Sequence, residues 1–106
     1  MIAEKPKSFD GAMDNWRQFK FTFLGYAGAV NARLEQAMIE SEVMQEAAIM
    51  NSALPVGDQQ ASAQLYYMLV LFLEGSAQRL LEHAGGGEGW LSWHRLVAEY
   101  EPITAG

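Results

Sequence analysis

The sequence predicts an all-α protein, folded as a compact bundle of about five helices. Its 106 residues match a common size for one domain, and half of them are apolar, enough to form a core. Apolar residues recur at spacings of three and four along most of the chain, as on one face of a helix. No alternating pattern typical of a strand extends beyond a run better explained as helix.

We expect three regions along the chain. Residues 1–8 form a flexible polar arm, because Pro6 and its lysine neighbours disfavour regular structure. Residues 9–102 form a single helical domain, with Phe9 as the first core residue. Residues 103–106 are a tail or the start of a linker.

The central helix is predicted over about 58–74, with Asp58 as its N-terminal cap. Every residue from Leu65 to Leu73 is apolar or aromatic, and a helix that is apolar all round either crosses a membrane or forms the centre of a bundle. This run rises only about 14 Å, whereas about 20 residues are needed to cross a bilayer. Because Glu74 follows directly, we predict a core helix around which the others pack.

The first helix is expected over about 12–28, following the turn signal Asp10-Gly11. Phe21 and Leu24 should widen its apolar stripe, so that it is more buried than an ordinary surface helix. The stripe consists of residues at helical spacing: Met13, Trp16, Phe19, Phe23 and Tyr26 or Ala27.

A second helical segment is expected over 30–51, since its intrinsic helix propensity is high throughout. One face is rich in alanine and methionine and the other in glutamate, so burial should be shallow. Pro55 ends the segment, because a residue that precedes proline avoids helical angles.

A short fourth helix is expected over 76–84, with Gly75 at the junction and Ser76 as the cap. The glycine-rich segment 85–89 is predicted to be a flexible loop. The last helix should cover about 89–101 and end before Pro102. Its buried stripe is expected to be Trp90, Trp93, Leu96 or Val97, and Tyr100.

Composition excludes several classes of function. The chain has no cysteine, so disulfides, thiolate metal sites and thiol catalysis are impossible. The net charge is −6 and the lysines and arginines are scattered, which disfavours direct binding to nucleic acid. The N-terminus lacks the apolar segment of a signal peptide, so we expect a cytoplasmic location and no membrane association.

The candidate chemical sites have simpler explanations. His83 and His94 stand on different predicted helices without further histidine ligands, so we expect surface or helix-end histidines rather than a metal site. The 85–89 loop lacks the preceding strand and the lysine of a phosphate-binding loop. Ser76 lies outside any nucleophile elbow. We therefore predict no enzyme activity, no cofactor and no metal.

Two features of the sequence are open to more than one interpretation. The acidic run from Glu35 to Glu46 could supply an acid–base pair, although a solvated helix face is the ordinary explanation. Met38, Met44 and Met50 recur at near-helical spacing and could line an adaptable groove for a partner helix or peptide. Core filling is the commoner role of such methionines.

Three clusters of residues together resemble the Gag capsid region of LTR retrotransposons and the related domesticated capsid proteins of the neuronal Arc type. They lie in FDGAMDNWRQFKFTF, LYYMLVLFLEGSAQRLL and GWLSWHRLVAEYEP. The residues that carry the resemblance form a structural core motif: Phe9, Gly11, Trp16, Phe19, Phe23, Leu65, Leu69, Phe72, Gly75, Ala77, Leu80, Trp90, Trp93, Leu96 and Tyr100.

The resemblance covers about residues 7–102 and implies a lobe like the N-terminal lobe of retroviral capsids. It implies a structural protein that associates with copies of itself, through pentamers and hexamers in the full-length protein, into a shell that packages RNA. RNA contact would be left to another module, since no zinc knuckle is present. A peptide-binding adaptor, as in the domesticated relatives, is the alternative, and an unrelated helical enzyme fragment is a third.

Overall fold

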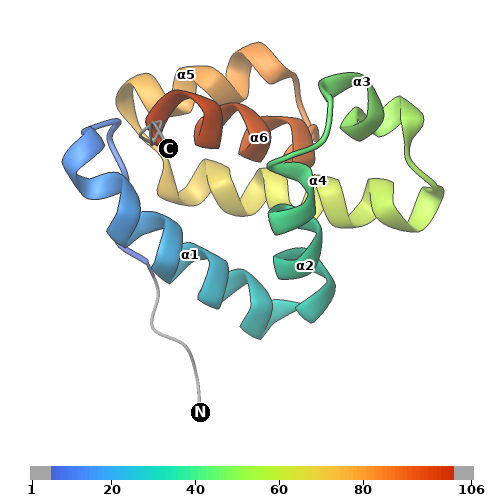
Figure 1. Cartoon of the computed structure of the whole chain (residues 1–106), viewed down its shortest axis with the longest axis horizontal. Coiled ribbons are helices and arrows are strands. Elements are labelled where there is room, and N and C mark those ends of the chain that lie inside the picture. Colours follow the sequence, from blue (N-terminus) through green and yellow to red (C-terminus); the bar gives the residue numbers. More distant parts are fainter. Residues whose placement is uncertain (1–5, 102–106) are drawn as a thin grey trace.

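The computed structural model describes residues 6–101, and in this range the protein is all-α, as predicted (Figure 1). Residues 1–5 and 102–106 lie outside the described residues. They include most of the predicted arm and all of the predicted tail. The helices, with two short 3-10 turns, follow in the order η1 (Met13–Asn15), α1 (Trp16–Val30), α2 (Ala32–Ser41), α3 (Glu46–Ile49), η2 (Asn51–Ala53), α4 (Val56–Phe72), α5 (Gly75–Ala84) and α6 (Gly89–Tyr100).

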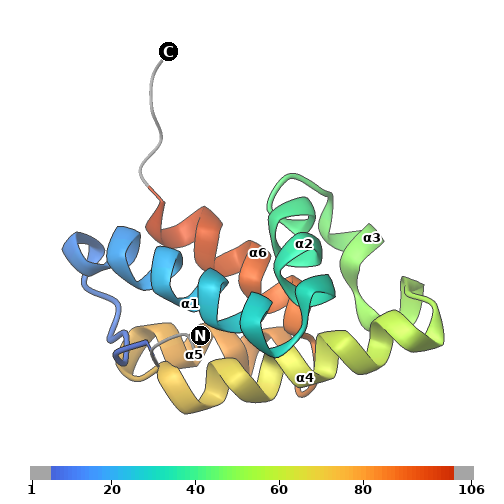
Figure 2. The ribbon, with the colours of Figure 1, turned by 90° about the horizontal axis from the view of Figure 1, so that it is seen from below.

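The helices form one compact body with a radius of gyration of 12.9 Å, close to the value of about 13 Å for a domain of 100 residues. Helix α1 packs against α2, and α6 packs against α2, α3, α4 and α5. In Figure 2, the end of α6 and the turn that follows α2 lie on the same side of the molecule. No helix in the described part of the chain has both the length and the apolar character needed to cross a membrane.

The most enclosed helix is α6 rather than α4, which corrects the prediction of a fully wrapped central helix. Helix α4 buries Leu65 and Leu69, but it exposes Tyr67, Val70 and Leu71 on its outer side. The apolar run is therefore wider than the surface that other helices cover. By contrast, the buried side of α6 includes both of its tryptophans, together with residues on neighbouring faces.

The beginning of α1 differs from the prediction. Met13 lies in a 3-10 turn and is exposed, because the helix with a regular period of 3.6 residues begins only at Trp16. Phe21 does not widen the apolar stripe, since it points away from the side that carries Phe19 and Phe23. Leu24 is half-buried, as a residue at the border of the stripe.

The segment predicted as one helix over 30–51 is divided. Helix α2 ends at Ser41, a turn follows, and α3 is a single helical turn. Burial in α2 is deep rather than shallow, because Leu34 and Met38 are completely enclosed. Met44 and Met50 are exposed, so the three methionines do not share one face.

The caps of two helices also differ. Pro55 is the residue before α4, while Asp58 lies in its first turn and forms an ion pair with Arg33 at 3.3 Å. Glu74 precedes α5, and the Ser76 hydroxyl lies 3.1 Å from the hydroxyl of Tyr100. Both predicted caps thus contact other elements.

The core is dominated by aromatic rings from the two ends of the chain. Phe9 meets Tyr100 edge to face at 5.0 Å between ring centroids, and Trp16 lies 5.6 Å from Trp93. Phe23 stacks on Trp93 at 5.8 Å. These tilted, stacked and edge-on arrangements are those that aromatic pairs favour, and they join α1 to α6.

The segment before α1 is held against the junction between α4 and α5. The backbone N–H of Phe9 donates to the carbonyl of Phe72 at 2.8 Å, and Glu74 N–H donates to the carbonyl of Phe9 at 3.0 Å. Gly75 has a φ of 62°, and a side chain there would approach the carbonyl oxygen of Asp10 to 3.0 Å. Glycine is therefore required at this junction. Pro6, in the predicted arm, is buried.

Candidate functional site

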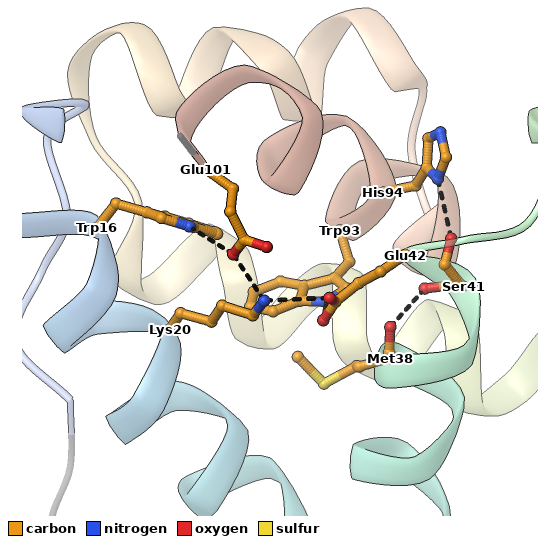
Figure 3. A network of polar contacts seen from close by, with 8 residues as sticks. All are labelled: Trp16, Lys20, Met38, Ser41, Glu42, Trp93, His94 and Glu101. Carbon is orange, nitrogen blue, oxygen red and sulfur yellow. Dashed lines mark hydrogen bonds and ion pairs between the residues drawn. The ribbon is translucent and has the colours of Figure 1, made fainter. Parts of the chain in front are cut away.

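A polar cluster joins α1 to the turn after α2, to α6 and to the residue that follows α6 (Figure 3). The ammonium group of Lys20 lies 2.7 Å from Glu101 and 3.0 Å from Glu42. The indole N–H of Trp16 donates to Glu101 at 3.3 Å, and that of Trp93 donates to Glu42 at 3.1 Å. We call these five residues the lysine network.

Local structure explains why the lysine network can form. Trp16 and Lys20 are four residues apart on α1, so their side chains lie on the same side of the helix. Glu42 stands in the turn directly after α2, and Glu101 directly after α6. The network thus connects the ends of α2 and α6 to α1, next to the rings of Trp16 and Trp93 in the core.

The charges in the network stabilise one another. Burial alone would lower the pKa of the Lys20 ammonium, but hydrogen bonds to Glu101 and Glu42 and the charges of both carboxylates outweigh it, so this pKa is raised. Burial alone would raise the pKa of Glu101, but hydrogen bonds from Lys20 and Trp16 and the lysine charge lower it. Lys20 and Glu101 are therefore both held in their charged forms.

These pKa shifts are opposite to those that acid–base catalysis at neutral pH requires. A general base or acid is most effective when its pKa lies near the working pH. In the lysine network the pKa of the lysine moves up and that of Glu101 moves down, away from neutrality. The arrangement is suited to fixing the positions of helices.

A second polar link holds the same turn. The imidazole Nδ1 of His94 lies 2.8 Å from the carbonyl oxygen of Ser41, and the Ser41 hydroxyl donates to the carbonyl of Met38 at 2.9 Å. With Nδ1 as the donor, His94 occupies this carbonyl at the end of α2. His83 is exposed in the last turn of α5.

An ion pair connects α3 to α6. The guanidinium of Arg95 donates twice to the carboxylate of Glu46, with both distances 3.1 Å. This hydrogen bond is the main reason why the pKa of Glu46 is lowered, and the arginine charge adds to the effect. The predicted acidic face is thus partly used in internal contacts through Glu42 and Glu46.

The glycine-rich loop packs against other elements. The Glu88 carboxylate accepts the backbone N–H of Asn51 at 2.7 Å, and the carbonyl of Gly87 accepts from the Asn51 side chain at 2.7 Å. The first N–H groups of α6, those of Gly89 and Trp90, donate to the buried Ser62 hydroxyl at 2.9 and 3.1 Å. These donors are therefore satisfied within the protein.

The residues of the structural core motif fall into three groups. Gly75 is exposed at the helix junction, and Gly11, Phe72 and Leu80 are half-buried. The others are buried: Phe9, Trp16, Phe19, Phe23, Leu65, Leu69, Ala77, Trp90, Trp93, Leu96 and Tyr100. Among residues 6–101, no group of three or more histidine or acidic side chains is arranged to hold a metal ion.

A surface groove borders the lysine network. Its volume is about 540 Å³, and it runs along the outer side of α1 beside Glu101. Its lining combines apolar and charged side chains: Met13, Trp16, Arg17, Lys20, Phe21, Leu24 and Glu101. We call it the α1 groove. Sequence reasoning missed it, because it assigned Met13 and Phe21 to the core.

Comparison of the chain with known proteins finds no matching family model, no matching curated protein and no matching solved structure.

Proposed function

We propose that this chain is a structural lobe of a capsid-like protein that associates with copies of itself and performs no catalysis. In the full-length protein, such lobes would form the shell of a cytoplasmic retrotransposon particle that encloses RNA. The sequence resemblance supplies the family part of this proposal, and an all-α lobe is the fold that it implies.

The observation that carries the proposal is the amount of apolar surface outside a well-packed core. Tyr67, Val70 and Leu71 are exposed at helical spacing, so they lie together on the outer face of α4. Phe21 and Val43 are still more exposed, at 79% and 88%. Extended apolar patches on a protein surface are typical of interaction sites.

The charge distribution supports the proposal that another module of the full-length protein binds the RNA. The net charge is −6, and three of the basic side chains, Lys20, Arg33 and Arg95, pair with carboxylates of the same chain. A surface of this kind offers little attraction to phosphate groups. RNA would therefore be bound by a separate part of the full-length protein.

The test is the dependence of mass on concentration. Light scattering of the purified chain, from micromolar to millimolar concentration and at low and high salt, should show mass above that of the monomer. Electron microscopy of the concentrated samples should show rings or particles. A monomer under every condition would overturn the proposal.

A peptide-binding adaptor is the second candidate, and the α1 groove favours it. Its apolar lining includes the Met13 and Phe21 side chains, as expected of a groove that adapts to different ligands. Screening a peptide library against the chain tests this function. Saturable binding by a chain that stays monomeric would favour the adaptor over the shell protein.

A further inference from the structure

Two neighbouring pairs of residues show the reverse of the usual hydrophobic pattern. In Lys20-Phe21 the lysine side chain is only 21% exposed, while Phe21 is exposed to solvent. In Glu42-Val43 the glutamate side chain is 15% exposed, while Val43 is the most exposed large apolar residue in the described chain. Charged side chains are ordinarily at the surface and apolar ones inside. In each pair, the exposure of the apolar side chain to water is therefore energetically unfavourable.

The Lys20–Glu42 ion pair connects these two pairs of residues. Lys20 and Glu42 bond to each other, and their apolar neighbours stand beside them on α1 and on the turn after α2. Lys20 and Phe21 line the α1 groove, whereas Glu42 and Val43 lie in the turn after α2, which also includes the exposed Met44. The groove is a concave surface, and the turn ends a helix.

The charges of the two surfaces are complementary. Arg17 lies in the α1 groove and forms no ion pair with the residues that the structure describes. Glu40 is exposed just before the turn, and its one hydrogen bond with a side chain among residues 6–101 is from Gln36 at 3.4 Å. The groove therefore offers an apolar wall with a free positive charge, and the turn offers apolar side chains with a free negative charge.

The turn is already ordered in the single chain. Glu42 is held by Lys20 and Trp93, and the carbonyl of Ser41 is held by His94. A segment that is fixed before it binds loses less conformational entropy on association. An exposed valine on such a turn is a suitable group to enter a groove.

We infer that the α1 groove of one copy binds the turn after α2 of a second copy, with Val43 against Phe21 and Glu40 paired with Arg17. This inference rests on the proposed function, because it names the partner surface for self-association. Because the groove and the turn are different surfaces, the contact can repeat from copy to copy around a ring or be made twice across a two-fold axis.

Charge reversal tests the inference directly. The variants Arg17→Glu and Glu40→Arg each place like charges opposite each other, and each should weaken self-association by about tenfold. An equal mixture of the two variants places opposite charges together again, and it should associate as the parent does. Arg79→Glu, an exposed arginine on α5, is the matched control and should leave association unchanged.

Association is measured by sedimentation equilibrium, and thermal melting checks that each variant is folded. Val43→Ser provides a test that does not depend on charge, and it should also weaken association. If the parent associates but Arg17→Glu and Glu40→Arg associate equally well, the inference is wrong and the proposed function stands. If both variants are weakened and their mixture is not restored, the pairing is wrong. A parent that stays monomeric overturns the proposed function itself.

Discussion

Helices α4 and α6 pack tightly at Gly89, and Gly89→Ala should be strongly destabilising. Gly89 is buried at the start of α6. A Cβ atom there would lie 1.9 Å from the carbonyl oxygen of Ser62 and 3.0 Å from the Cβ of Leu65, both on α4. Neither atom can swing away as the end of a long side chain could, so α4 and α6 would have to separate.

The required movement sets the magnitude. Ordinary contact begins at 3.4 Å, so the carbonyl of Ser62 would have to move by about 1.5 Å. Overpacking of this kind costs about 1–3 kcal/mol. The same movement stretches the hydrogen bonds from the N–H groups of Gly89 and Trp90 to the Ser62 hydroxyl, and leaving buried donors unsatisfied costs about 1–3 kcal/mol. Together these costs predict a loss of about 2–6 kcal/mol in the free energy of unfolding.

The assay is urea denaturation followed by circular dichroism at the helical band, and Gly25→Ala is the matched control. Gly25 is exposed inside α1 with no atom within 4 Å of an added Cβ. Alanine in place of glycine in a helix is favourable by about 0.5–1 kcal/mol, so Gly25→Ala should be more stable than the parent. If Gly89→Ala unfolds at the same urea concentration as the parent, the close contact of α4 and α6 is refuted.

Two further predictions concern the core and the charges. Leu65 is completely buried, so Leu65→Ala should lower the free energy of unfolding by about 2–5 kcal/mol. Leu71 is 74% exposed, so Leu71→Ala should change it by less than about 0.5 kcal/mol. Equal effects of the two substitutions in urea denaturation would contradict the exposed outer face of α4. The pKa values of Glu101 and Glu46 are lowered in the folded protein, so their stabilising contribution is present above the ordinary value of 4.5 and is lost as pH falls through the folded pKa. Stability should therefore decrease on acidification below about pH 4.5, and Lys20→Met should make this decrease smaller in urea titrations at several pH values.

Periodicity was sufficient to predict most of the core. The spacing of the aromatic residues correctly placed Trp16, Phe19, Phe23 and Trp93 in the core. Aromatic residues three or four positions apart share one face of a helix, and packing that face against the core removes it from water. The end of α5 before Gly85 followed equally well from a residue that interrupts helices. These features depend on local chemistry, which a single sequence contains.

The division of the second helical segment could not be predicted in this way. Nothing within residues 30–51 forbids a continuous helix, and no proline or glycine occurs there. The helix ends at Ser41 where Glu42 bonds to Lys20 and Trp93, and His94 bonds to the carbonyl of Ser41. These partners come from distant parts of the chain, so the break depends on the tertiary structure. The candidate sites depend on the same long-range contacts.

Two failures of the hydrophobic pattern stand next to residues of the lysine network. Phe21 was predicted to face the core and is exposed, and it stands next to a residue of the lysine network. Val43, the most exposed large apolar residue described, also stands next to one. A mostly buried charged side chain beside an exposed apolar one is the reverse of the usual distribution. Where local preference and structure disagree at a well-ordered position, function is the usual reason. The lysine network joins α1 to the ends of α2 and α6, and the exposed Phe21 and Val43 stand directly beside two of its residues, Lys20 and Glu42.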